Sequence, residues 1–79
     1  MQNKELLERF ISDNFNKEEI TIKWHKSWVV EIKDKNNDSM VLTTIDPNVI
    51  STSINGKKYL DYKLHYHKPS GNLIWIVLN

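Results

Sequence analysis

The sequence predicts a single α+β domain over residues 1–79, with one N-terminal helix packed on a twisted antiparallel sheet. Three observations lead to this class. Apolar residues recur at helical spacing near the N-terminus, alternating apolar and polar residues fill most of the remaining chain, and turn-forming residues separate the alternating segments. Because the chain has no cysteine, the hydrophobic core of this small domain must hold it together without disulfides.

The predicted helix runs from residue 3 to about residue 15. Asn3 is the expected N-cap, and an acidic residue at position 5 suits the positive end of the helix dipole. One apolar stripe follows the helical period, formed by Leu6, Leu7, Phe10, Ile11 and Phe15. A helix of this length is marginal alone, so we expect the stripe to cover one face of the sheet.

The sheet is expected to be a meander of five to six strands, either open or curled into a half-barrel. Residues 20–33 form a hairpin in which a three-residue loop at 25–27 aligns Trp24 with Trp28. Residues 40–45 and 49–54 form the next two strands, separated by a break at Pro47.

Asn55-Gly56 is the strongest hairpin signal in the chain. A two-residue loop would set Ile50 opposite Asp61, whereas a three-residue loop ending at Gly56 sets it opposite Leu60. The apolar match favours the longer loop.

The terminal hairpin, residues 58–78, is the segment around which the sheet is organised. A three-residue loop at 69–71 would align Leu64 with Ile76 and Tyr66 with Ile74, giving one apolar face. The reverse face then combines cationic and aromatic side chains and is the candidate partner-binding surface. Its residues are Tyr59, Lys63, His65, His67 and Trp75.

Charge and composition exclude several classes. The net charge is +1, too small for a strongly electrostatic surface over the whole molecule, although four lysines against Asp61 alone give +3 over residues 57–79. No apolar run resembles a signal peptide or is long enough to cross a bilayer, so no membrane association is expected. Together with the absence of cysteine, this favours a cytoplasmic protein.

The histidines raise the question of catalysis or metal binding. His65 and His67 project on the same side of one strand and could ligate a metal with His25 or Asp61, or form a ribonuclease-like acid/base site with Glu31. Neighbouring histidines are also ordinary on a solvent-facing strand, and no metal-ligand, nucleophile or phosphate-binding motif accompanies them. We expect no metal, no cofactor and no enzymatic activity.

Two binding functions remain. An uncovered patch around Leu73, Trp75 and Val77 would suit a protein partner, and the interleaved cations and rings would suit single-stranded nucleic acid as the alternative. In the alternative interpretation, Trp75 is a core residue that is buried against Trp24 or Trp28 and binds no partner. A homodimer through the last strand is a further option, because that strand leaves an open edge.

The chain resembles the small proteins with which phages disable host machinery, including anti-CRISPR and other anti-defence proteins. The resemblance lies in size, in the lack of catalytic motifs, and in a composition without alanine and rich in Lys, Asn and Ile, as AT-rich genomes encode. It implies an inhibitor that occludes a functional surface of a larger host protein, such as a nuclease or a nucleoprotein complex.

Overall fold

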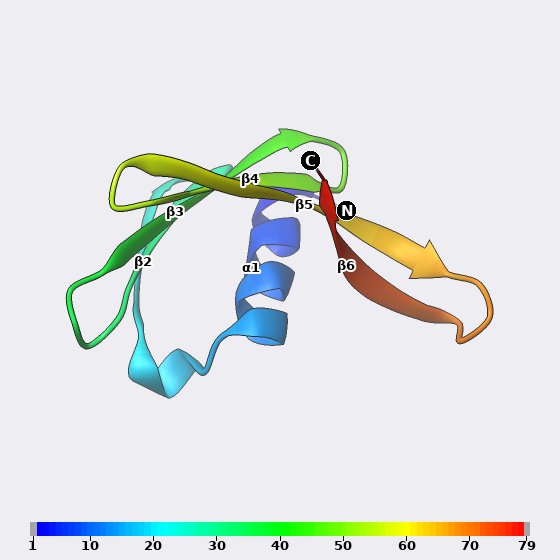
Figure 1. Cartoon of the computed structure of the whole chain (residues 1–79), viewed down its shortest axis with the longest axis horizontal. Helices are drawn as coiled ribbons and strands as arrows, with labels where there is room; N and C mark the ends of the chain where they lie inside the picture. The colour runs from blue at the N-terminus through cyan, green and yellow to red at the C-terminus, as the bar shows by residue number, and fades with distance from the viewer. Residues whose placement is uncertain (1, 79) are drawn as a thin grey trace.

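The computed structural model describes residues 2–78 and shows one helix on one face of a six-stranded antiparallel sheet (Figure 1). A helix, α1, and a 3₁₀ turn, η1, precede the strands. Their bounds are α1 Asn3–Asn14, η1 Lys17–Glu19, β1 Thr21–Lys26, β2 Val29–Lys33, β3 Ser39–Asp46, β4 Val49–Ile54, β5 Lys57–His67 and β6 Asn72–Leu78. The order of strands in the sheet follows the chain, and the sheet is open. The predicted α+β meander is confirmed in its open form.

The helix α1 covers the sheet with the apolar stripe expected from its sequence. Its buried residues are Leu6, Leu7, Phe10 and Ile11, with Phe15 partly buried beyond the helix end. The expected N-cap is wrong, because Asn3 already lies in the helix and Gln2 occupies the cap position without a side-chain hydrogen bond. The amide of Leu6 instead bonds the carbonyl of Gln2 at 3.0 Å, which starts the helix one residue earlier.

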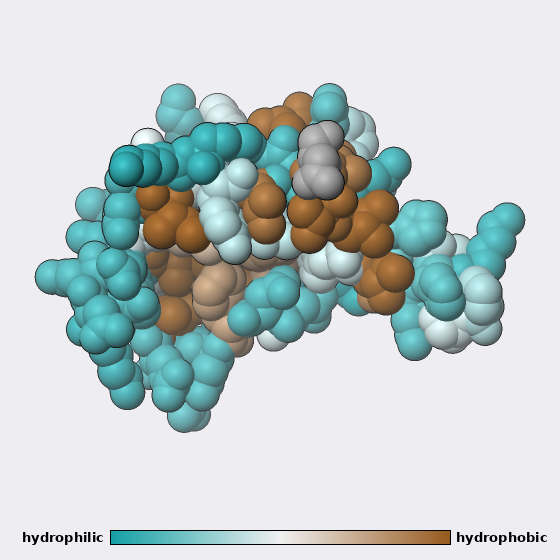
Figure 2. Space-filling view, viewed as in Figure 1, coloured by the Kyte–Doolittle hydropathy of each residue, from teal (hydrophilic) through white to brown (hydrophobic). Residues whose placement is uncertain are grey.

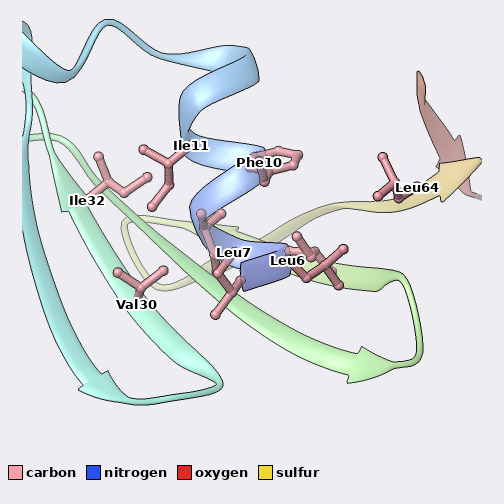
Figure 3. Close-up of a cluster of buried hydrophobic side chains, with 9 residues drawn as sticks. Leu6, Leu7, Phe10, Ile11, Val30, Ile32 and Leu64 are labelled. Carbon is pink, nitrogen blue, oxygen red and sulfur yellow. The ribbon is translucent and has the colours of Figure 1, made fainter. Parts of the chain in front are cut away.

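The core lies between α1 and the middle of the sheet (Figure 3). Its strand residues come from four strands and all face the helix: Val30, Ile32, Leu42, Ile50 and Leu64. The register pairs Val30 with Leu42, and this places the even-numbered residues of β2, and of β3 as far as Thr44, on the helix side. Met40 and Leu42 therefore face the helix, and Val41 lies on the opposite side of β3.

The first hairpin has a shorter turn than predicted. Lys26 pairs with Val29, so the turn contains only two residues, and a bulge near His25 shifts the register to pair Trp24 with Val30. Trp28 therefore lies in the turn, and its predicted alignment with Trp24 is wrong. The bulge adds one residue to β1, which lets a two-residue turn coexist with matched apolar faces.

The β4–β5 hairpin also combines a two-residue turn with matched apolar faces by means of a bulge. Asn55 and Gly56 both have positive φ, 50° and 84°, and form a two-residue turn with Ile54 opposite Lys57. A register shift follows, after which Ile50 pairs with Tyr62. The predicted three-residue loop is thus wrong, because a bulge rather than a longer loop restores the apolar match.

Thr52 stabilises this bulge from a buried position. Its hydroxyl donates to the carbonyl of Leu60 at 2.6 Å and accepts from the amide of the same residue at 3.1 Å. Thr52 is 1% exposed and is the buried polar residue among residues 2–78. One side chain therefore satisfies both backbone groups that the bulge removes from the ladder.

Replacing Thr52 by valine should lower the free energy of unfolding by about 1–3 kcal/mol, because both backbone groups of Leu60 lose their partner. Thr52→Ser keeps the hydroxyl and should cost only about 1 kcal/mol for the lost methyl group. Urea denaturation followed by circular dichroism measures both values. A serine variant less stable than the valine variant would contradict the role given to the hydroxyl.

The terminal hairpin differs from prediction in a way that moves Trp75. His67 pairs with Asn72, so the loop contains four residues, and Leu64 pairs with Trp75 instead of Ile76. The amide of Gly71, at φ 72°, closes the loop on the carbonyl of His67 at 2.8 Å. Because side chains alternate between faces, this one-residue change sends every β6 side chain to the face opposite the predicted one.

Candidate interaction surface on the terminal hairpin

The face of the terminal hairpin turned away from α1, called here the back face, carries Lys63, His65 and His67. The register sets Lys63 beside Ile76 and His65 beside Ile74. Paired residues of an antiparallel sheet share a face, so these cations neighbour isoleucines rather than the predicted tryptophan. The back face is a mixed apolar and basic strip.

Trp75 lies on the opposite side, against the helix. Its ring meets Phe10 edge-on with centroids 4.9 Å apart, and its indole Nε1 donates to Asp13 Oδ2 at 3.0 Å. Arg9 Nε lies 3.5 Å from the same Asp13 oxygen and forms an ion pair with it. The predicted pairing of Trp75 with His65 is wrong, and the tryptophan ties β6 to α1. The alternative in which Trp75 is buried against Trp24 or Trp28 is also wrong, because the ring of Trp75 packs against Phe10.

Tyr59 does not lie in line with Lys63, His65 and His67 on the back face, as the sequence predicted. The bulge puts Tyr59 and Leu60 together between two back-face residues, Lys58 and Asp61, where strict alternation would place only one. Burial raises the pKa of Tyr62, and the nearby Tyr59 adds to the effect. Of the five predicted site residues, Lys63, His65 and His67 are brought together, while Tyr59 and Trp75 are not.

The histidines are spread over different local structures. His67 Nδ1 lies 2.8 Å from Ser70 Oγ and so belongs to the hairpin loop. His25 Nε2 lies 3.0 Å from Glu31 Oε1, and this hydrogen bond lowers the pKa of the Glu31 carboxyl. Over residues 2–78 no group of three or more metal-ligating side chains gathers. His25 and Glu31 are therefore paired with each other on β1 and β2, apart from His65 and His67.

Asp61 is the carboxylate closest in sequence to the back-face cations, and it is already engaged. The Lys58 ammonium bonds both Asp61 and Ser51, and the hydrogen bond from Lys58 lowers the pKa of Asp61 despite some opposing desolvation. No acidic residue follows Asp61 in the sequence. The distal hairpin therefore presents positive charge without an internal counter-charge.

Residues 65–74, named here the hairpin arm, are exposed at every position. Figure 1 shows the arm extending beyond α1, and the molecule measures 39 × 24 × 22 Å. Three large apolar or aromatic side chains are exposed on it, Tyr66 at 54%, Leu73 at 38% and Ile74 at 38%. Figure 2 shows apolar surface reaching the base of the arm, with a hydrophilic tip. These residues form the strongest candidate interaction surface.

The prediction placed Tyr66 and Ile74 on the covered face and missed their exposure. The exposure of this end of the hairpin could have been predicted from the lengths of the helix and the strand. A twelve-residue helix is about 18 Å long at 1.5 Å per residue, whereas an eleven-residue strand extends about 36 Å. The helix is too short to cover the whole of β5, so one end of the hairpin must project.

A groove of about 750 Å³ lies at the other end of the molecule, between the end of α1 and the β2–β3 turn. Its apolar lining includes Phe15, Ile20 and Met40, and its polar lining includes the carboxylate of Asp34. Asp34 Oδ1 accepts the amides of Asn36 and Asp38, so this carboxylate holds the turn together. None of the five predicted site residues lines the groove.

Comparison with protein-family models, with curated proteins and with solved structures finds no match to this chain. Over residues 2–78 no helix is long and apolar enough to cross a membrane.

Proposed function

We propose that the chain is a non-enzymatic binding module whose hairpin arm docks onto a larger protein. The observation that carries the proposal is the exposure of Tyr66, Leu73 and Ile74 on an element that projects beyond the helix. Tyrosine is a frequent anchor at interface centres, and apolar side chains around it exclude water from the contact. A projecting hairpin can reach into a concave surface that the compact body could not enter.

The charges on the arm indicate the kind of partner surface that fits it. Lys68 lies in the loop, Lys63 lies just before the arm, and residues 62–78 contain no carboxylate. A neutral or acidic surface would complement this arrangement, whereas a basic surface would be repelled. In this proposal the module works in the cytoplasm and occludes a functional surface of a host protein, as do the phage anti-defence proteins that it resembles in size and composition.

The proposal is tested with two tyrosines of the same strand that are similarly exposed. Tyr66→Ser alters the arm, and Tyr59→Ser, at 49% exposure, is the matched control on the body of the sheet. Tagged wild-type and variant proteins are used to capture partners from a lysate of a low-GC bacterium, followed by quantitative mass spectrometry. We expect at least one protein to be retained by wild type and control but reduced about tenfold or more by Tyr66→Ser.

The same purified proteins test the alternative function, binding of single-stranded nucleic acid. The ring of Trp75 packs on Phe10, which removes from the back face the tryptophan expected to stack on bases. A gel-shift experiment with single-stranded DNA and RNA at low salt should show no complex. A complex that dissociates steeply as salt is added would favour the alternative, and a captured protein insensitive to Tyr66→Ser would exclude the arm as its docking site.

A further inference from the structure

We propose that β6 pairs antiparallel with β6 of a second copy of this chain, joining two sheets into one. The sheet has two edges, β1 and β6, and over residues 2–78 no strand pairs with the outer side of β6. Such an edge presents unpaired amide and carbonyl groups that another strand can satisfy. This inference concerns assembly. It uses Leu73 and Ile74, which the arm also offers to its proposed partner, whereas Tyr66, the residue that tests the docking proposal, lies on β5 away from the joined edge.

The apolar side chains of β6 are exposed on both of its faces. Val77, at 49% exposure, and Leu73 lie on the helix side, because they pair with Tyr62 and Tyr66, while Ile74 lies on the back face opposite His65. A partner docked flat on one face would cover only one of these sets. A strand added at the edge would contact both sets at once, since its own side chains alternate between the two faces.

A second copy of β6 fits this edge better than any other strand of the chain. Every residue of β6 after Asn72 is apolar, so self-pairing brings no like charges together. The other edge, β1, carries Lys23 and Lys26, and cationic side chains on an edge oppose strand addition. Pairing β6 with β1 of another copy would also generate an open chain of molecules, whereas pairing β6 with itself closes a symmetric dimer.

The alternation of side chains fixes the register of the proposed pair. With Trp75 on the two-fold axis, Leu73 lies opposite Val77 of the second copy and Ile74 opposite its Ile76. This register pairs all of Asn72–Leu78 and keeps helix-side residues opposite helix-side residues. Moving the axis to Ile74 or Ile76 would leave part of the strand unpaired. Both helices lie on the same side of the joined sheet.

The experiment uses the full chain, which has no cysteine of its own. Two double variants place cysteines at the proposed pairs, Leu73→Cys/Val77→Cys and Ile74→Cys/Ile76→Cys. Within one strand, positions 73 and 77 lie about 13 Å apart and cannot bridge, whereas positions 74 and 76 lie about 7 Å apart, and any bridge between them within one chain leaves a monomer on the gel. Oxidised glutathione should convert at least one double variant largely into a covalent dimer on a non-reducing gel. Leu73→Cys/Ile76→Cys, whose cysteines lie on opposite faces, is the control and should stay largely monomeric.

Light scattering on the unmodified chain provides a second measurement. Wild type should show about twice the 9.4 kDa chain mass at high micromolar concentration, and Val77→Lys should show the monomer mass with an unchanged circular dichroism spectrum. The lysine replaces an exposed side chain, so folding is expected to survive. A wild-type monomer at millimolar concentration would overturn the proposal, as would a dimer that Val77→Lys leaves intact or cross-linking that does not depend on register.

Discussion

Replacing Phe10 by alanine is expected to lower the free energy of unfolding by about 3–5 kcal/mol. Phe10 is buried, and its ring contacts three other aromatic rings, those of Phe15, Tyr62 and Trp75, at centroid distances of 6.3, 5.0 and 4.9 Å. These rings come from the segment after α1, from β5 and from β6. The alanine variant would lose the contact that joins the helix to the terminal hairpin.

A loss of this size is a large fraction of the about 5–15 kcal/mol that stabilises a typical domain, so the variant should be close to unfolding at 37 °C. Urea denaturation followed by circular dichroism gives the difference. Phe10→Leu keeps most of the apolar volume and is expected to cost less than about 1.5 kcal/mol. An alanine variant as stable as the leucine variant would show that the aromatic contacts do not hold the helix on the sheet.

Replacing Trp75 by alanine is expected to cost about 2–4 kcal/mol, somewhat below the value for a fully buried tryptophan because the side chain is only partly covered. The variant loses the edge-on contact with Phe10 and the hydrogen bond to Asp13. Trp28, exposed at 43% in the first turn, supplies the control. Trp28→Ala removes a ring beneath the Lys26 ammonium and should cost less than about 1 kcal/mol.

The two stability predictions are linked through a double-mutant cycle. Because Phe10 and Trp75 touch, the variant that lacks both rings should be about 0.5–1.5 kcal/mol more stable than the sum of the single effects implies. Denaturant midpoints for the four proteins, analysed with a common slope, give this coupling. Additive effects would contradict direct contact between the rings, and a Trp28→Ala loss equal to that of Trp75→Ala would contradict the different burial of the two tryptophans.

The helix and most strands could be predicted because their signals are local. The stripe from Leu6 to Ile11 repeats at helical spacing, and Pro47 and Gly56 interrupt the strand patterns where turns occur. The fourth strand, 49–54, has the predicted bounds. The hairpin predicted over residues 20–33 is also present, as β1 and β2, although the pairing of its two strands differs from the predicted one.

The register could not be predicted because the argument from apolar faces assumes an uninterrupted ladder. Bulges near His25 and at Tyr59–Leu60 each add one residue to one strand, which separates turn length from face matching. Nothing in the sequence around these residues distinguishes a bulged strand with a two-residue turn from a regular strand with a three-residue turn. The hydroxyl of Thr52 decides the second case through contacts formed only in the folded sheet.

The candidate site was affected more than the fold because it depended on a single loop. One additional residue between His67 and Asn72 moved Trp75 to the helix side and brought Ile74 and Ile76 beside the cations. Lys63, His65 and His67 kept their common face because all three lie on β5 beyond its bulge, where the register is continuous and alternation fixes their positions. Residues of one uninterrupted strand segment are thus predicted more securely than residues separated by a bulge, such as Tyr59, or residues that meet across a hairpin.

The agreement between strand order and chain order has a consequence for how fast the molecule folds. Each strand pairs only with strands next to it in the sequence, so the ladder can grow by successive closure of short loops. Proteins with such local connectivity have low contact order and reach the native state faster than sheets of equal size with long crossovers. We expect the docking of α1 to be the slower event, because its contact with Trp75 joins segments far apart along the chain.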